Sequence, residues 1–438
     1  MHSHRTKSES STVDWRFTFA TSGILLLSSS HGAYFATGSN IARYAMLLLG
    51  FLSIVGAAAL GAKALRGRDI VRGAAVAMGA ALLAMQAWAL KQDLFEFPVP
   101  VFHAVCIALL FAGYALGNAR VNSVRGFSGW ALVPAAIVSI VCLFFMWRFL
   151  GSVGVSGAER SYGDTELNPI SVAYYNSVLF TGYSVLMIGA NRMIPRAVFG
   201  VGAGLSALMV ATSGSRGAVI WVLVTALVFA PILARRVLAG AKQLTLLGGA
   251  LAIAGLGGFV LAKGGGDALE RVDVLVKRSQ SLYYSITEGE ADISTNAREL
   301  MWGYYTRHPQ VAWPFGEAGY AGYPHNQYIE LYARFGLVGL VFALLSLLLF
   351  SRILLHVWRT RRDPDWESIV LFSVFVFAYL QSMTSMSLEM NRVLWLGFGY
   401  FLGSPKRAIP PAPNHTSHGL GHRDNAAHRG SGSRWRAT

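Results

Sequence analysis

The chain has 438 residues, of which 54% are hydrophobic and only 13% are charged, with a mean hydropathy of +0.45. Soluble domains carry about 25% charged residues, so this composition excludes an ordinary soluble protein and favours an all-α polytopic membrane protein. A net charge of +15 would suggest a nucleic-acid ligand in a soluble protein. Basic loops on one side of a membrane explain the charge more simply, so we expect no nucleic-acid partner.

The apolar runs predict about twelve transmembrane helices. A helix needs about 20 mostly apolar residues to cross a bilayer. The runs that reach or approach this length are 17–37, 41–62, 70–90, 98–118, 127–147, 169–190, 194–213, 216–234, 243–262, 329–355, 367–386 and 388–404. The two cysteines, Cys106 and Cys142, lie inside such runs, which argues against a disulfide framework or a thiolate metal site.

Lys and Arg are concentrated in alternate loops. If the N-terminus is cytoplasmic, the cytoplasmic segments hold most of these residues and the short outer loops hold few. The positive-inside rule then predicts that both termini are cytoplasmic and that the large loop 263–328, between the ninth and tenth spans, lies outside. Residues 1–404 would form the transmembrane domain. The Pro-, His- and Arg-rich residues 405–438 would form a disordered basic tail, either merely solvated or in contact with anionic lipid.

The large loop is a long polar interval in a chain made mostly of apolar runs. Within it, Thr295 or Asn296 could cap a short helix that Pro309 would stop after His308. Arg298 and Trp302 are four residues apart, so they would share one face of that helix. We expect the helix to lie along the membrane surface. Arg298 could bind an anion or simply contact a lipid headgroup.

Arg216 begins the eighth predicted span, directly after the polar residues Thr212 to Ser215. The free N–H groups at a helix start and a guanidinium together suit an anion, typically phosphate. The alternative is an interfacial arginine that only extends to water.

His325 lies in a turn between Pro324 and Asn326, just ahead of a helix predicted to begin near Tyr328. Proline restricts the backbone here, and a rigid turn suits a histidine that acts as a general base near neutral pH. A histidine without a catalytic role is the alternative. The sequence has no second histidine four residues on, no clustered cysteines and no carboxylate triad, so we predict no metal site.

Two arginines lie within predicted spans, where charged side chains usually face a cavity or a partner. Arg334 could pair with Glu330, four residues earlier, or contact a substrate. Arg392 could pair with Glu389, three residues earlier.

These features occur together in a recognisable order. The matching residues are Thr212-Ser213-Gly214-Ser215-Arg216-Gly217, then Ala297-Arg298 with Trp302, His308-Pro309, Gly316, Gly319, Pro324-His325-Asn326, Tyr328, Glu330 and Gly336-Leu337-Val338-Gly339-Leu340. This set resembles the bacterial O-antigen ligase and O-antigen polymerase superfamily. The resemblance covers about residues 168–345 at the level of motifs, and the layout of twelve spans with one late periplasmic loop is similar over nearly the whole chain.

The resemblance implies an inner-membrane glycosyltransferase that works at the periplasmic face, in contact with membrane lipid, without a metal or other cofactor. Its donor would be a saccharide on undecaprenyl pyrophosphate, and its acceptor another saccharide or lipid A core. Arg216 and Arg298 would hold the pyrophosphate, and His325 would be the general base or would orient the acceptor hydroxyl. Trp302, Asn326 and Arg334 are further candidate substrate contacts. Arg160, in the loop 151–168, is a possible additional phosphate ligand.

Alternatives remain at two levels. Ligases, polymerases and protein glycosyltransferases of this superfamily share the motifs, so the sequence does not choose between them. A carrier or flippase of lipid-linked saccharide, or a structural partner of other polysaccharide assembly proteins, is also compatible with the composition. The gathering of arginines near one face of the predicted membrane domain favours the enzyme.

Overall fold

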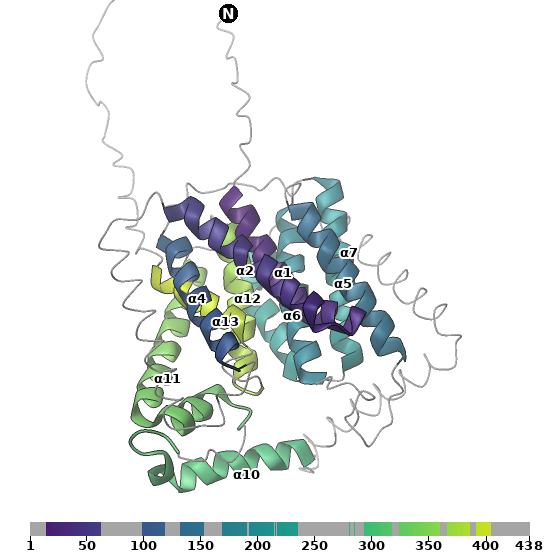
Figure 1. Cartoon of the computed structure of the whole chain (residues 1–438). Coiled ribbons are helices and arrows are strands. Elements are labelled where there is room, and N and C mark those ends of the chain that lie inside the picture. Colours follow the sequence, from purple (N-terminus) through teal and green to yellow (C-terminus); the bar gives the residue numbers. More distant parts are fainter. Residues whose placement is uncertain are drawn as a thin grey trace, which may run out of the picture. The chain divides into compact units, whose positions relative to one another are not determined.

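The computed structural model describes residues 15–62, 99–118, 132–152, 169–190, 192–213, 215, 217–234, 280, 284, 293–317, 324–359, 366–385 and 391–403. The regular elements of this part are helices (Figure 1), which confirms the all-α prediction. They are α1 (Trp15–Thr37), α2 (Asn40–Ala62), α4 (Val99–Asn118), α5 (Val133–Ser152), α6 (Pro169–Gly189), α7 (Met193–Ser213), the helix Gly217–Ala234, α10 (Ile293–Arg307), the 3-10 helix η3 (Pro309–Ala312), α11 (Gln327–Arg359), α12 (Trp366–Ser382) and α13 (Arg392–Gly403).

Most predicted spans that fall on described residues agree with a helix to within a few residues. The prediction 127–147 is displaced, because α5 begins at Val133 and ends at Ser152. The prediction ended where the apolar run ends. A helix is defined by its backbone hydrogen bonds, which do not depend on apolar side chains, so α5 can continue past Trp147. α12 ends at Ser382, four residues before the predicted end at 386. The predicted spans 70–90 and 243–262 lie outside the described residues.

Four of the described helices contain stretches long and apolar enough to cross a membrane: Asn40–Leu60, Met193–Val210, Gly217–Ala234 and Gln327–Leu355. Large apolar side chains along them are exposed, including Leu48, Leu227 and Leu348. Contiguous exposed apolar faces are rare on soluble monomers and are expected where lipid is the solvent. The structure is therefore consistent with an all-α membrane protein. The count of twelve spans and the side on which the large loop lies stay predictions.

The bundle is held by close helix contacts. α1 packs against α2, α5 and α6, while α13 packs against α4 and α12 packs against α6. Between α4 and α13 the backbones nearly touch, because a Cβ atom added to Gly399 would lie 1.9 Å from the Leu110 carbonyl oxygen and one on Gly113 would lie 2.2 Å from that of Leu396. Small residues at helix crossings allow this approach, and membrane helices use them to gain packing contacts.

α11 is broken at Gly336, whose φ of 58° and ψ of −133° are not helical. In an unbroken helix, the N–H of Leu337 would donate to the carbonyl of Ala333. Instead, the Leu337 N–H donates to the Pro314 carbonyl at 2.9 Å, and the Ala333 carbonyl accepts from the Glu317 N–H at 2.8 Å. One helical hydrogen bond is thus replaced by two bonds to the docking segment, which we define as residues 312–317.

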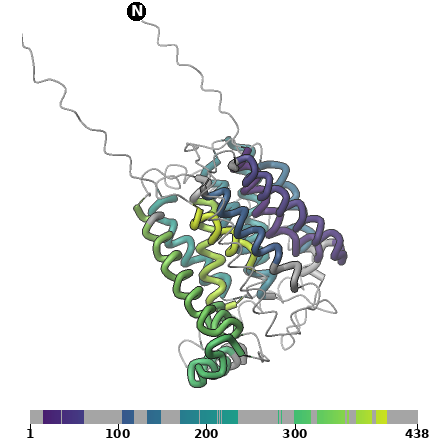
Figure 2. Tube along the Cα trace, turned by 60° about the vertical axis from the view of Figure 1, so that its left-hand side comes forward, coloured from purple at the N-terminus to yellow at the C-terminus, as the bar shows by residue number. Residues whose placement is uncertain are grey.

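The docking segment approaches α11 backbone to backbone, and glycines at two positions permit this. A Cβ atom on Gly336 would lie 2.1 Å from the Pro314 carbonyl oxygen. A Cβ atom on Gly316, which has a φ of 102°, would lie 2.3 Å from the Arg334 carbonyl oxygen. Both glycines belong to the motif set that carries the family resemblance, and this contact supplies a physical reason for their presence. α10 and the docking segment consequently lie across the end of the bundle at which α11 begins (Figures 1 and 2).

Candidate functional site

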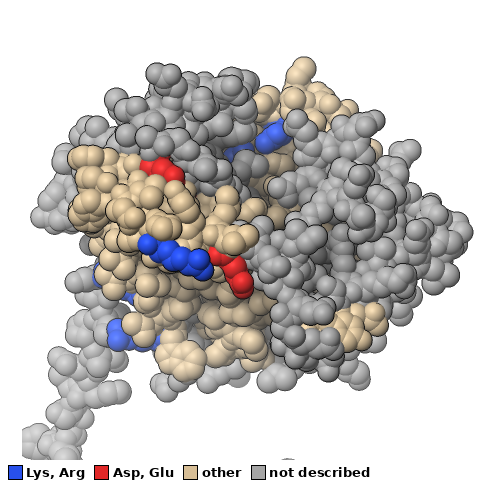
Figure 3. Space-filling view, turned by 90° about the horizontal axis from the view of Figure 1, so that it is seen from below, with Lys and Arg blue, Asp and Glu red and all other residues tan. Residues whose placement is uncertain are grey.

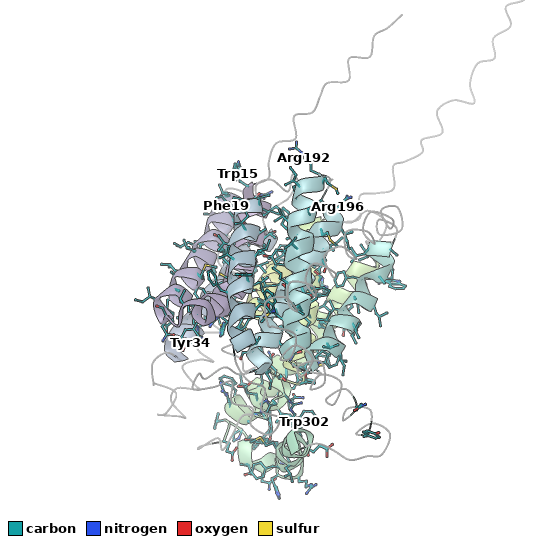
Figure 4. The ribbon with its side chains drawn as sticks, turned by 90° about the vertical axis from the view of Figure 1, so that its right-hand side faces the viewer. Trp15, Phe19, Tyr34, Arg192, Arg196 and Trp302 are labelled. Carbon is teal, nitrogen blue, oxygen red and sulfur yellow. The ribbon has the colours of Figure 1, made fainter. Side chains whose placement is uncertain are left out.

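The candidate site lies at the end of the bundle that carries α10. Figure 4 shows Trp302 of α10 beyond the end at which Tyr34 lies, whereas Trp15, Arg192 and Arg196 mark the opposite end. The bond from Trp302 to Pro324 places the start of α11 at the Trp302 end, and the bonds from Asn326 to Met383 and from Asn391 to Ala378 bring the end of α12 and the start of α13 to it. The residues that the sequence singled out on described elements are therefore gathered at one end of the molecule.

The Pro324–Asn326 turn, which contains His325, is fixed by the side chain that follows the histidine. Asn326 caps α11, because its Oδ1 accepts the backbone N–H groups of Tyr328 at 3.0 Å and Ile329 at 3.2 Å. Its Nδ2 donates to the Met383 carbonyl at 3.0 Å, just beyond the end of α12. His325 is half-buried and has a φ of 54°, a left-handed conformation that non-glycine residues adopt rarely. The turn thus presents His325 in one defined backbone conformation.

α10 contacts the same turn. The Trp302 indole Nε1 donates to the Pro324 carbonyl at 2.7 Å, directly before His325. Arg298 lies one helical turn before Trp302, so it is on the same face of α10, and it is half-buried. The predicted helix after 295 is confirmed with Pro309 beyond its end, but it begins at Ile293, ahead of both positions that were predicted as caps, Thr295 and Asn296.

The described helix that begins at Gly217 meets the site through the turn that follows α12. Arg216 itself lies outside the described residues, while Ser215 and the helix that begins at Gly217 are described. Trp221 Nε1 of that helix donates to Thr384 Oγ1 at 2.9 Å, and a Cβ atom on Gly217 would lie 3.4 Å from the same oxygen. Thr384 is the neighbour of Met383, whose carbonyl holds Asn326. The 383–385 turn therefore connects the start of the Gly217 helix to the Pro324–Asn326 turn.

Glu317 fixes α10 to the docking segment. Its carboxylate accepts hydrogen bonds from the Tyr305 hydroxyl at 2.7 Å and from the Tyr304 hydroxyl at 3.3 Å. Burial, followed by the bond to this carboxylate, raises the pKa of Tyr305 above its ordinary value. Both tyrosines consequently remain neutral donors at physiological pH. Through this contact and the bond from Trp302 to Pro324, α10, which carries Arg298, is attached both to the docking segment and to the Pro324–Asn326 turn.

The structure confirms the predicted pairing within α11. Arg334 Nη2 lies 2.9 Å from Glu330 Oε1, and the two side chains are 9% and 0% exposed. A substrate contact by Arg334 stays a prediction. Arg392 begins α13 and is buried. Its predicted partner Glu389 lies outside the described residues, as does Arg160.

The face that carries α10 has few charged side chains among its described residues. Figure 3 shows it from below, with Lys or Arg beside Asp or Glu near the centre, uncharged residues on their left, and a few further acidic and basic side chains elsewhere on the view. Several aromatic or aliphatic side chains on α10 and the docking segment are exposed, namely Leu300, Tyr304, Trp313 and Phe315. This composition agrees with the expectation that α10 lies along a membrane surface, where tryptophan and tyrosine are enriched.

The sequence predicted that Arg298 and Trp302 share a face of one helix, but it gave no indication of the bond that ties Trp302 to the Pro324–Asn326 turn. Asn326 was expected to contact substrate, and its described contacts are a helix cap and a bond to Met383. The signal was present, since asparagine directly before a helix start is a preferred cap. The contributions of Thr384 and Glu317 had no local signal, because each depends on contacts between distant parts of the chain.

We expect the Trp302→Phe variant to loosen the Pro324–Asn326 turn, because phenylalanine cannot donate to the Pro324 carbonyl although its ring can still pack in place of the indole. Loss of one hydrogen bond costs about 1 kcal/mol, so the unfolding midpoint should fall slightly and amide exchange at Tyr328 and Ile329 should rise. Hydrogen exchange with mass spectrometry checks this. Trp313→Phe is the control, because Trp313 is 56% exposed. Equal exchange in Trp302→Phe and wild type would show that the indole N–H does not hold the turn.

A scan against models of known protein families finds no match for this chain. Searches of curated protein sequences and of solved structures find no significant similarity either.

Proposed function

We propose that the protein is a glycosyltransferase of the bacterial inner membrane that uses an undecaprenyl-pyrophosphate-linked saccharide at the periplasmic face. It would act in polymerising a surface polysaccharide or in ligating O-antigen to lipid A core. The observation that carries the proposal is the meeting of three motif-bearing segments at one end of the bundle. Trp302 of α10 bonds Pro324, Asn326 bonds Met383, and the Gly217 helix contacts Thr384 through Trp221.

The proposed chemistry needs two kinds of group. The acceptor hydroxyl oxygen forms a bond to the anomeric carbon while the bond from that carbon to the pyrophosphate oxygen breaks. His325 takes the hydroxyl proton as general base. Arg216 and Arg298 stabilise the negative charge that develops on the leaving pyrophosphate, a role for which paired guanidinium donors are well suited. The half-buried position and fixed turn of His325 support its part in this scheme.

Genetic complementation tests the proposal. The gene is deleted and restored as wild type or as Arg216→Ala, Arg298→Ala or His325→Ala, with each variant quantified in the membrane and surface polysaccharide resolved on gels. Loss of a general base lowers a rate by about 10²–10⁴-fold, and loss of a charge-stabilising donor lowers it by about 10²–10³-fold. We therefore expect all three variants to lose polysaccharide.

The chain offers matched controls. Arg307→Ala removes an exposed arginine of the same α10 helix, and Arg192→Ala removes an exposed arginine at the opposite end. These should restore wild-type polysaccharide. Complementation by the three site variants as well would reject catalysis and favour a carrier or a scaffold.

The products distinguish the two reactions. Loss of long chains while single repeat units still reach the surface identifies a polymerase. Loss of all saccharide on lipid A core, with accumulation of lipid-linked chains, identifies a ligase.

A further inference from the structure

The exposed apolar surface of α11 begins at the break of the helix. Residues 327–336 are buried or half-buried, whereas Leu337 and Val338, directly after the break, are exposed. From there on, the exposed apolar side chains recur at helical spacing on one broad face, which comprises Leu337, Val338, Leu340, Val341, Leu344, Leu345, Leu347, Leu348 and Leu355. A continuous face of this kind is expected where lipid surrounds a helix.

The length of this face matches the thickness of a bilayer. At about 1.5 Å per residue, the helix rises about 27 Å between Leu337 and Leu355, and the hydrocarbon core of a membrane is about 30 Å thick. Trp358 and Arg359 follow, and both are exposed. Tryptophan favours the interface between membrane and water, and arginine is common just beyond it. Spanning the bilayer with this face therefore puts Leu337 near one boundary of the hydrocarbon and the end of α11 near the other.

The docking segment is bonded to α11 at the first of these boundaries. The Leu337 N–H donates to the Pro314 carbonyl at 2.9 Å. The two neighbours of Pro314 are large and apolar, and they face outward, since Trp313 is 56% exposed and Phe315 is 63% exposed. Both residues thus lie beside the residue at which the exposed apolar face of α11 begins.

α10 extends this exposed surface. Leu300 and Tyr304 are one helical turn apart, so they share a face of α10, and both are exposed. The Tyr304 hydroxyl donates to Glu317 of the docking segment at 3.3 Å, which holds the helix beside that segment. We define Leu300, Tyr304, Trp313 and Phe315 as the interface patch. None of these four side chains carries a charge at neutral pH.

The backbone of the docking segment is suited to a region that holds little water. The N–H groups of Trp313, Gly316 and Glu317 donate to backbone carbonyls of the protein, and Pro314 has no N–H group. Unpaired backbone groups are costly where lipid excludes water, so this pairing lowers the cost of bringing the segment to the hydrocarbon boundary.

We propose that the interface patch inserts into the lipid leaflet on its side of the membrane, at the boundary between headgroups and acyl chains, with phospholipid as its partner. Tryptophan and tyrosine are enriched at this depth, and insertion removes exposed apolar side chains from water. The sequence predicts a surface position for α10 alone. The bond between Pro314 and Leu337 extends that position to the docking segment and gives its depth.

Insertion also has a consequence for the candidate site. α10 carries Trp302, whose indole bonds the Pro324 carbonyl. Anchoring α10 and the docking segment in the leaflet therefore holds the Pro324–Asn326 turn at a fixed height above it. The inference does not depend on the proposed reaction, because the depth of a side chain is measured without substrate or turnover.

Electron paramagnetic resonance on the full-length protein in vesicles of phosphatidylethanolamine and phosphatidylglycerol measures this depth. A nitroxide attached to Phe315→Cys collides with oxygen, which concentrates in lipid, or with a nickel chelate, which stays in water. Cys106 and Cys142 are buried, so the unmutated chain taken through the labelling gives the background. Leu337→Cys marks the boundary depth, and Leu345→Cys, about two turns further along α11, marks a greater depth.

Glu299→Cys marks the aqueous side, because Glu299 is an exposed residue of α10 that points about 100° away from Leu300 around the helix. We expect the ratio of oxygen to chelate collisions at Phe315→Cys to match that at Leu337→Cys, to exceed that at Glu299→Cys severalfold, and to stay below that at Leu345→Cys.

A second labelled position, Trp313→Cys, should give the same ratio as Phe315→Cys, so a folding defect in one variant leaves the other to decide. Ratios at both positions equal to that at Glu299→Cys would overturn the proposal, because the patch would then face water. Protection of both positions from oxygen and from the chelate would overturn it as well. That result would show that protein, such as a second copy of this chain, covers the interface patch.

Discussion

Replacing Gly336 with alanine is expected to cost on the order of 3–5 kcal/mol of stability through backbone strain and overpacking. Only glycine adopts the φ of 58° and ψ of −133° at this position without strain, and an added Cβ would lie 2.1 Å from the Pro314 carbonyl oxygen. The clash is with backbone, which cannot rotate away as a side chain can. The yield of monodisperse protein after detergent extraction and the thermal unfolding midpoint should both fall.

Gly56 provides the matched control. It lies inside α2, and a Cβ atom added there would meet no atom within 4 Å. Gly56→Ala should therefore be neutral or slightly stabilising, because alanine favours the helix by about 1 kcal/mol over glycine. If Gly336→Ala unfolds at the wild-type temperature, the docking segment cannot lie against the break of α11 as described.

The second large effect is expected from Glu330→Gln. The Glu330 carboxylate is buried and lies 2.9 Å from Arg334 Nη2, whose side chain is 9% exposed. Breaking a buried ion pair from one side leaves the remaining charge poorly compensated and costs about 3–5 kcal/mol. Unfolding by SDS in mixed micelles measures the loss. Glu299→Gln, which changes an exposed carboxylate on α10, should stay within about 0.5 kcal/mol of wild type.

A double variant separates stability from function at this pair. Glu330→Gln with Arg334→Met removes both charges, so it should recover much of the stability lost in Glu330→Gln alone. If the double variant is stable and still makes polysaccharide, Arg334 has only a structural role. A stable double variant without polysaccharide would support the predicted substrate contact. Strictly additive losses in the cycle would show that the two side chains do not interact in the folded protein.

Local patterns predicted the elements of this molecule well. The apolar runs located most of the described helices, Pro309 marked the end of α10, and the spacing of Glu330 and Arg334 indicated their pairing. Each of these depends on residues within about one or two helical turns of one another. Hydrophobic periodicity, proline positions and residue spacing are sequence signals of contacts between near neighbours in the chain, so they predict such features directly.

Contacts between distant segments were not predictable in the same way. The break at Gly336 lies in an apolar run that reads as one continuous span, and its cause is the Pro314 carbonyl, which reaches Leu337 from the preceding loop. The contacts of Tyr175 with the His31 ring and with Arg392 likewise join residues from three separate segments of the chain. The position of Arg216 lies outside the described residues, so its place in the site stays a prediction.

The exchange of hydrogen bonds at the break of α11 has a consequence for biosynthesis. The Ala333 carbonyl and the Leu337 N–H lie within an apolar helix, where unpaired backbone groups are costly in lipid. Their partners, Pro314 and Glu317, precede them in the chain and therefore leave the ribosome first. The order of synthesis thus supplies the partners before the groups that need them.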